Sequence, residues 1–280
     1  MSESPLKVWL DRDGTLLRLR LARPKANIVD AAMIAALDAA LAEYRDVKEL
    51  RAVLLDHEGP HFSFGASVDE HLPGQCAEML KALHALVRSM LNFPLPLLVA
   101  IKGQCLGGGL EVAAAGSMLF AATDAKLGQP EIKLAVFAPA ASCLLPERIG
   151  QARAEDLLLS GRSMGAEEAL ATGLVDSVSE DPEAAALAYF DQSLATSSAS
   201  TLRFAVLAAR QEYRQRVITK LERVEDLYLS ELMATHDAVE GLTAFLEKRP
   251  ARRVRSRIAG AHARIDLAVG VVLSLGSVQT

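Results

Sequence analysis

Residues 94–131 decide the fold of this chain; they read PLPLLVAIKGQCLGGGLEVAAAGSMLFAATDAKLGQPE. Residues 97–101 are apolar, include β-branched side chains and lie between prolines and glycines, which predicts a short buried strand. Gly107, Gly108 and Gly109 follow, and residues 110–115 are good helix formers that end at Gly116. The glycines therefore leave bare backbone N–H groups at the positive end of a helix dipole. Such a place can bind an anion, or an oxygen that becomes negative during a reaction.

Two glutamates accompany this turn. Glu111 lies three residues beyond Gly108, about one helical turn on, so its carboxylate and the bare amide point to the same side. Glu131 follows a second apolar stretch, residues 118–122, within the sequence Gly-Gln-Pro-Glu. Both acids also have a plainer interpretation, because an acid in the first helical turn stabilises the dipole and Pro-Glu is common at helix starts. The spacing alone leaves both interpretations open.

The segments GQCLGGGLEVAAAG (residues 103–116) and KLGQPEIKL (residues 126–134) resemble the enoyl-CoA hydratase/isomerase, or crotonase, superfamily. The resemblance extends over residues 21–249 and implies an α/β crotonase (ClpP-like) fold, a superhelix of stacked ββα units. It implies that Glu111 and Glu131 are catalytic, and that the amides of Ala66 and Gly108 form an oxyanion hole. Ala66 lies in FSFGAS, residues 62–67, where the family usually ends in Asp. Ser67 therefore departs from the pattern, which affects a side-chain role there but not the amide of Ala66.

The resemblance also implies further contacts with the substrate. In the family, the segment that corresponds to residues 23–26 lines the coenzyme A groove, although an exposed loop lysine is commonly only solvated. The sequence FLEKR at residues 245–249 resembles a motif whose Phe and Lys reach the coenzyme A of an adjacent subunit. The substrate-binding residues implied in this way are Lys25, Ala26, Gly65, Ser67, Val68, Gly107, Phe137, Phe245 and Lys248.

Residues 132–142, IKLAVFAPAAS, carry bulky Val136, Phe137 and Pro139 where common enoyl-CoA hydratases have a glycine-rich segment. Core packing explains such residues at least as well, but they are also typical of a pocket shaped for a particular acyl group. Together with HFSFGASVDEHLPGQC, residues 61–76, this segment resembles the branch of the family that hydrates a cyclic, conjugated dienoyl-CoA in anaerobic aromatic degradation.

The chain is expected to comprise three parts. Residues 1–195 alternate strands, turns and helices and are expected to form the ββα core with the coenzyme A site and the active site. Residues 196–257 are almost entirely helical in pattern, and the resemblance implies that they pack against a neighbouring subunit to build a homotrimer or a hexamer of two trimers. Residues 258–280 lie beyond the family core and have no predicted role.

Composition excludes several classes of protein. The net charge of −5 over 280 residues argues against a general binder of nucleic acid, and the six basic residues in 248–257 are better explained by a nearby coenzyme A phosphate. No apolar run reaches the ~18 residues of a membrane span, and no signal pattern begins the chain, so we expect a cytoplasmic protein without a membrane partner. The three cysteines show no metal-binding or redox spacing.

Residues 8–16, VWLDRDGTL, resemble the DxDGT motif of haloacid-dehalogenase-type phosphatases, in which the first Asp attacks phosphate. However, Asp13-Gly14 is a strong turn pair, and leucines alternate with arginines after it. The segment therefore predicts a β-hairpin, and no paired-Asp magnesium site is evident elsewhere in the sequence.

Three of the histidines have alternative interpretations. His57 and His61 stand four apart, as metal ligands on a helix do, but Gly59-Pro60 between them prevents a helix, so no metal site is expected. His84 falls on the polar side of an expected helix over residues 75–90, so we expect it to be solvated.

The resemblance thus implies a lyase that adds water to a conjugated acyl-CoA thioester, with coenzyme A as part of the substrate and no other cofactor. The two amides would stabilise the enolate oxygen while the two glutamates share the proton transfers; which glutamate is acid and which is base stays open. The alternatives are a general 2-enoyl-CoA hydratase or an isomerase on the same scaffold, and a non-catalytic acyl-CoA-binding protein. Both acids at the family spacing favour catalysis, because binding alone requires neither.

Overall fold

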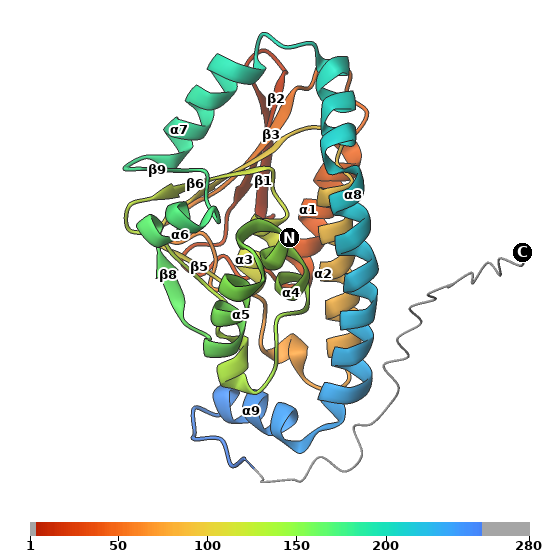
Figure 1. The fold of residues 1–280 in the computed structure, drawn as a ribbon, viewed down its shortest axis with the longest axis vertical. Helices are drawn as coiled ribbons and strands as arrows, with labels where there is room; N and C mark the ends of the chain where they lie inside the picture. Colours follow the sequence, from red (N-terminus) through yellow and green to blue (C-terminus); the bar gives the residue numbers. More distant parts are fainter. Residues whose placement is uncertain (1–3, 254–280) are drawn as a thin grey trace, which may run out of the picture.

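The computed structural model of the chain describes residues 4–253. A six-stranded sheet forms its centre, in the order β1-β2-β3-β4-β6-β9 (Figure 1). The first two strands pair antiparallel and the other neighbours pair parallel. The strands are β1 Leu6–Asp11, β2 Leu16–Leu21, β3 Ala52–His57, β4 Leu97–Ile101, β6 Met118–Ala122 and β9 Ser177–Ser179. β4 is buried along its whole length, as expected for a parallel strand covered on both faces.

A second sheet, in the order β5-β7-β8, consists of Gln104–Leu106, Lys126–Gly128 and Ser163–Gly165. β4, β5 and α3 (Gly108–Ala114) follow one another along the chain, as do β6, β7 and α4 (Pro139–Ile149). β3 is followed in the same way by residues 62–66 and α2 (Cys76–Leu91), because Ser63 pairs with Cys105 of β5. These repeated units are the stacked ββα architecture that the sequence predicted.

Helices cover both faces of the large sheet because its side chains alternate between two buried clusters. Leu54 and Leu98 face α7, whereas Val53 and Val99 face the cluster that also contains residues of α1 to α4. The remaining helices are α1 Ala31–Tyr44, α5 Gln151–Ser160, α6 Ala166–Thr172, α7 Pro182–Tyr189, α8 Ala199–Asp226 and α9 His236–Leu246. No helix within residues 4–253 is both long enough and apolar enough to cross a membrane.

The hairpin predicted at the N-terminus is confirmed. β1 and β2 pair from Leu6 with Leu21 to Asp11 with Leu16. On one face of β2 the leucines enter the core, and on the other Arg18 is buried and forms an ion pair with Asp56 of β3. The carboxylate of Asp11 accepts from Arg18 Nη1 at 3.2 Å. Asp11 therefore serves the hairpin, as the turn interpretation requires.

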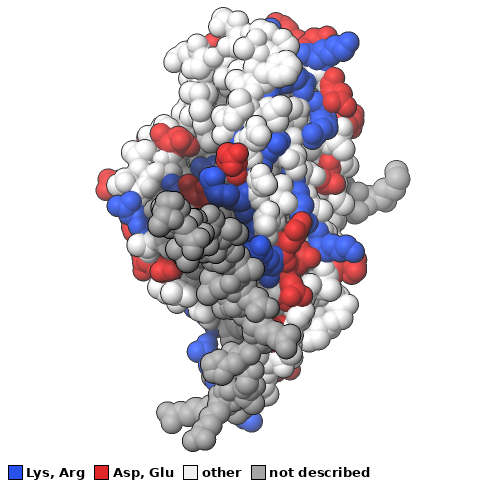
Figure 2. All heavy atoms as spheres, turned by 45° about the vertical axis from the view of Figure 1, so that its right-hand side comes forward, with Lys and Arg blue, Asp and Glu red and all other residues white. Residues whose placement is uncertain are grey.

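α8 packs against α2 and α4 and buries Val217 and Leu221 in the main core (Figure 1). It also covers His84 of α2, which is fully buried with its Nδ1 hydrogen-bonded to Glu225. The expectation that His84 is solvated was wrong, because the polar side of α2 lies under α8. Basic and acidic side chains are interspersed over the face drawn in Figure 2, so this face offers no single-sign patch to a polyanion.

After α8 the chain folds back onto its own core. Tyr228 is fully buried, and with Leu242 of α9 it packs in a cluster that contains Leu80 and Val136. A methyl group placed on Gly241 would lie 2.2 Å from the carbonyl oxygen of Leu134, so α9 meets the segment after Glu131 in direct backbone contact. In this chain the helices of the predicted 196–257 part thus cover the chain's own core. The predicted extension, 258–280, lies outside the described residues.

Replacing Gly241 by Ala should therefore push α9 away from Leu134. We expect overpacking to cost about 1–3 kcal/mol, which lowers Tm by roughly 2–10 °C for a domain of this size. Thermal unfolding followed by circular dichroism measures the shift. Gly165→Ala is the matched control, since its methyl group would meet only the flexible end of Lys126, at 3.3 Å. Equal melting of the two variants would contradict the proposed contact.

Candidate active site

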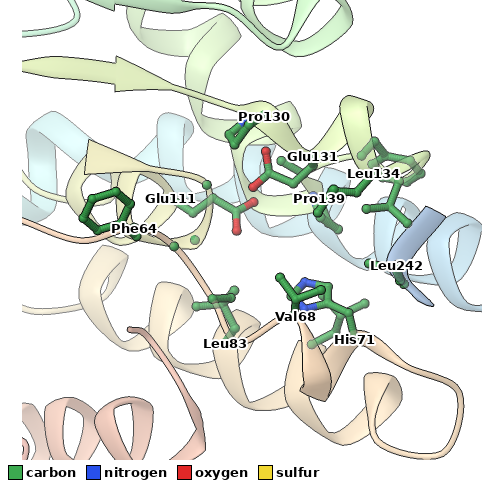
Figure 3. Close-up of a pocket in the computed structure, with 18 residues that line it drawn as sticks. Phe64, Val68, His71, Leu83, Glu111, Pro130, Glu131, Leu134, Pro139 and Leu242 are labelled. Carbon is green, nitrogen blue, oxygen red and sulfur yellow. The ribbon is translucent and has the colours of Figure 1, made fainter. Parts of the chain in front are cut away.

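An apolar cavity lies between the first turns of α3 and α4 on one side and α2 on the other (Figure 3). Residues 64–66, Val68 and His71 also line it, and Leu242 of α9 contributes to one side. Among the lining residues only His71, Glu111 and Glu131 carry ionisable side chains. The cavity therefore combines an apolar lining with two carboxyl groups.

The glycines between β5 and α3 bring two backbone amides together. Gly107 turns the chain with a φ of 50°, in the region that favours glycine, and α3 starts at the next residue. A methyl group on Gly108 would lie 3.0 Å from the amide nitrogen of Ala66, so the two backbones are in contact. Among the described residues, neither amide donates a hydrogen bond to another group. Two free N–H groups beside each other in a cavity suit a developing oxyanion.

The strand-like segment that carries Ala66 is fixed by its neighbours. The amide of Val29 donates to the carbonyl oxygen of Gly65 at 2.9 Å, and the amide of Gly65 donates to Ser63 Oγ at 3.0 Å. A methyl group on Gly109 would lie 2.5 Å from Cβ of Ser63, so α3 also packs directly against this segment. These contacts hold the Ala66 amide opposite Gly108.

Glu111 projects from the first turn of α3 into the cavity and is only 3% exposed. Its Oε1 accepts from the backbone N–H of Ala141, in the first turn of α4, at 2.8 Å. Burial raises the pKa of Glu111 well above its usual value, although the backbone N–H groups of Ala141 and Ala140 act in the opposite direction. Glu111 is thus a carboxyl group that can hold or release a proton near neutral pH.

Glu131 faces the same cavity from the start of the single-turn helix Pro130–Leu134 (Figure 3). Burial raises its pKa, and the nearby charge of Glu111 raises it further. Its Oε1 would lie 2.5 Å from a methyl group on Gly107, so a side chain at 107 would displace the carboxyl group. Two interacting carboxyl groups in one dry cavity cannot both be charged at low cost, so the pair holds one proton over a range of pH.

Two polar residues of the site were not predicted. Gln129 is buried, and with its amide oriented as its neighbours require, its nitrogen donates to both Glu131 oxygens, at 3.0 and 3.1 Å. Gln129 directly precedes the short helix Pro130–Leu134, so no strand or helix periodicity placed it beside Glu131. His71 ends a one-turn helix, Asp69–His71, and no sequence pattern predicted its place in the cavity.

The structure brings together eight of the residues predicted for the site. The catalytic candidates Glu111 and Glu131 and the amide-bearing Ala66 and Gly108 line the cavity, as do Gly65, Val68, Gly107 and Phe137. Lys25, Ala26 and Ser67 line a separate, open depression beside Arg23 and Glu70. Phe245 lines another depression with Lys133 and Arg249, and Lys248 lines neither it nor the acyl cavity. A contact of Phe245 or Lys248 with a neighbouring subunit stays a prediction.

The two histidines considered as metal ligands have other partners. His57 Nε2 accepts from the backbone N–H of Lys102 at 3.1 Å, and His61 Nδ1 accepts from that of Gln104 at 3.2 Å. Both rings thus tie the end of β3 and the following loop to the connection between β4 and β5. Across residues 4–253 no group of three potential ligands is arranged to hold a metal ion.

Comparisons with known proteins agree with this geometry. The family model described as enoyl-CoA hydratase/isomerase matches residues 11–253. The cyclohexa-1,5-dienecarbonyl-CoA hydratase of Thauera aromatica is 71% identical over 253 residues, which cover 90% of this chain and 98% of that protein. The mitochondrial methylglutaconyl-CoA hydratase of Rattus norvegicus is 31% identical over 236 residues, 81% of this chain and 75% of that protein.

Solved structures share the fold. The crystal structure of an enoyl-CoA hydratase/isomerase from Pseudoalteromonas atlantica T6c superimposes with a TM-score of 0.77 at 29% identity, over 89% of this chain and 100% of that one. The same conclusion follows from the stacked ββα units, from the two facing amides and paired carboxyl groups, and from a family model that spans nearly all the described residues. The chain belongs to the enoyl-CoA hydratase/isomerase family.

Proposed function

We propose that this protein is a hydro-lyase that adds water to cyclohexa-1,5-diene-1-carbonyl-CoA and forms 6-hydroxycyclohex-1-ene-1-carbonyl-CoA. The observation that carries the reaction class is the convergence of two free amides and two buried carboxyl groups in one apolar cavity. The choice of acyl group is supported by the 71% identity to the Thauera aromatica hydratase. The step belongs to the anaerobic degradation of benzoyl-CoA, in which a dearomatised ring must be hydrated.

The amides of Ala66 and Gly108 bind the thioester oxygen. When water attacks the β carbon of the thioester, electrons move through the double bond to this oxygen and give an enolate. The two N–H groups hydrogen-bond more strongly as the oxygen becomes negative, so they stabilise the transition state more than the substrate. Removal of one such donor typically costs ~10²–10³ in rate.

The two carboxyl groups of Glu111 and Glu131 transfer the protons. Since the pair holds one proton, its ionised member removes a proton from the attacking water and its neutral member supplies one to carbon. In a cyclic diene the enolate extends over the second double bond, so the proton is added at the remote ring carbon and the remaining double bond shifts next to the thioester. Water is thus added in a 1,4 sense, and the products balance without a redox change. Coenzyme A is part of the substrate, and the reaction requires neither a metal nor another cofactor.

The apolar wall suits a carbocyclic acyl group. Val68, Leu83, Val136 and Phe137 line the cavity, and their side chains offer no hydrogen bonds to the ring. The coenzyme A part would leave the cavity past Lys25, Ala26 and Ser67, on the outer surface. In the proposed homotrimer or hexamer, Phe245 and Lys248 would reach the coenzyme A of an adjacent subunit. The assembly would work in the cytoplasm, with neither a nucleic-acid nor a membrane partner.

Two alternatives remain on the same scaffold: a general 2-enoyl-CoA hydratase or isomerase, and a non-catalytic acyl-CoA binder. Ultraviolet absorbance should separate them when cyclohexa-1,5-diene-1-carbonyl-CoA and crotonyl-CoA are offered in parallel. We expect a higher kcat/KM for the cyclic diene. An equal or higher value for crotonyl-CoA would favour a general hydratase, and the absence of turnover with any enoyl-CoA would favour a binder.

Glu111→Gln and Glu131→Gln should each lower kcat by about 10²–10⁴-fold, because a general acid or base is lost. Binding of a non-reactive CoA ester should change little, since Gln keeps the shape of the side chain. Steady-state kinetics and calorimetric titration measure the two effects. Glu78→Gln, on the exposed side of α2, is the matched control. A near-normal rate in either cavity variant would remove that residue from the mechanism.

The raised pKa of Glu131 also predicts how stability depends on pH. A carboxyl group whose pKa is raised in the folded state stabilises the fold fully below its ordinary pKa, and this contribution is lost as pH rises through the raised value. Gln at this position stays neutral, so the Tm of Glu131→Gln minus that of the unmodified protein should grow between about pH 5 and about pH 9. Glu168→Gln should show no such trend, because Arg162 lowers the pKa of the exposed Glu168. If the difference in Tm between Glu131→Gln and the unmodified protein stayed constant over this pH range, the raised pKa of Glu131 would be contradicted.

A further inference from the structure

The imidazole of His71 is the polar group of the cavity that the proposed reaction does not use. It lies across the cavity from the carboxyl groups of Glu111 and Glu131 (Figure 3). Its Nδ1 lies 2.7 Å from the backbone carbonyl oxygen of Ser67. A carbonyl oxygen can only accept, so Nδ1 carries a proton and donates it. This hydrogen bond fixes both the plane of the ring and its tautomer.

The other ring nitrogen, Nε2, is therefore an acceptor without a donor. Burial lowers the pKa of His71, which keeps the ring neutral near pH 7 and leaves a lone pair on Nε2. Within residues 4–253 no group donates to this atom. The surrounding wall, which includes Val68, Leu134 and Leu242, is apolar and offers no donor. His71 is half-buried, so Nε2 meets either water or a donor of a ligand that enters the cavity.

The position of His71 decides which part of a substrate would meet it. A thioester whose oxygen lies on the amides of Ala66 and Gly108 places its acyl group between the glutamates and the opposite wall. Water delivered by Glu111 and Glu131 adds on their side, so the hydroxyl group that the reaction creates lies away from His71. A donor that replaces water at Nε2 must therefore already be part of the acyl group.

We propose that His71 is a specificity-determining residue that admits cyclic acyl-CoA thioesters which already carry a ring hydroxyl on the side away from the glutamates. The hydroxyl donates to Nε2, and the protein thus accepts hydroxylated cyclic dienoyl-CoA substrates beside the unsubstituted one. This inference rests on the proposed function, because the thioester must be held at the two amides for its ring to reach His71.

Binding of saturated, non-reactive esters tests the proposal without any turnover. Cyclohexanecarbonyl-CoA and the cis and trans isomers of 3-hydroxy- and 4-hydroxycyclohexanecarbonyl-CoA are titrated calorimetrically into the full-length protein. One hydroxylated isomer should bind about 2- to 12-fold more tightly than the unsubstituted ester, which is the net contribution of one hydrogen bond that replaces a bond to water. The other isomers place the hydroxyl against apolar side chains and should bind less tightly than the unsubstituted ester.

Two variants show whether the preference comes from Nε2. His71→Leu should abolish the preference and leave the unsubstituted ester bound as well as before or better. His71→Gln should keep part of it, since the side-chain carbonyl oxygen of Gln can accept in place of Nε2. A merely structural role of His71 would weaken all esters alike and leave their ratio unchanged.

The outcomes separate the two proposals. If the esters bind but no hydroxylated isomer is preferred, or if the preference survives in His71→Leu, the role of His71 is wrong and the proposed function stands. If the unmodified protein binds none of the esters, the acyl-thioester pocket itself is wrong and both proposals fall.

Discussion

The close approach of the backbone at Gly108 to the backbone at Ala66 is the constraint on which the site depends. Each of the three consecutive glycines meets a different neighbour: Gly107 the carboxyl group of Glu131, Gly108 the amide of Ala66, and Gly109 the side chain of Ser63. Any side chain there would separate two ββα units that the small sheet holds side by side. The bare N–H groups are thus a consequence of packing as well as of the helix terminus, and the same contact orients the acids.

The second requirement is a dry cavity around the two acids. Burial alone would keep both carboxyl groups neutral, and a neutral pair contains no base. Backbone N–H groups of α4 act on Glu111, and the buried amide of Gln129 acts on Glu131, so each ionised form has hydrogen-bond donors. Acid and base chemistry near neutral pH then follows because desolvation, the largest effect, raises both pKa values, while hydrogen-bond donors limit the rise.

The cavity is closed by parts of the chain that lie far from the glycine turn in sequence. α9 brings Leu242 to the lining through the contact of Gly241 with Leu134, and the one-turn helix at residues 69–71 brings His71 to the wall that faces the acids. In the proposed reaction the acids and amides carry the chemistry, whereas these outer segments would contact the acyl group. Under this proposal, selectivity among acyl groups would reside in segments that do not contact the amides of Ala66 and Gly108.

Much of the fold could be predicted from the sequence, because strands, turns and helices depend on patterns among neighbouring residues. Side-chain periodicity and turn chemistry predict the buried strand at residues 97–101, the glycine turn and the hairpin closed by Asp13-Gly14. They also predict the helices over residues 75–90 and 110–115. α4 was not predicted, since a proline lies inside it at position 146 and its amphipathic pattern is weak. The short strands of the second sheet were also missed, because three residues carry too little periodicity to detect.

Only the tertiary structure decided which side chains are buried together. The sequence predicted a solvated His84, but α8 covers this residue in the structure. Neither Gln129 nor His71 could be assigned to the site from its neighbours in sequence. Lys25 and Glu111 were predicted for one site by resemblance, yet only Glu111 lines the acyl cavity. The sequence by itself determined the long strands and the turns, since these depend on adjacent residues, and its resemblance to a family indicated the two acids. The environment of each group depends on segments that are distant along the chain, and it is this environment that sets pKa values and hydrogen-bond partners.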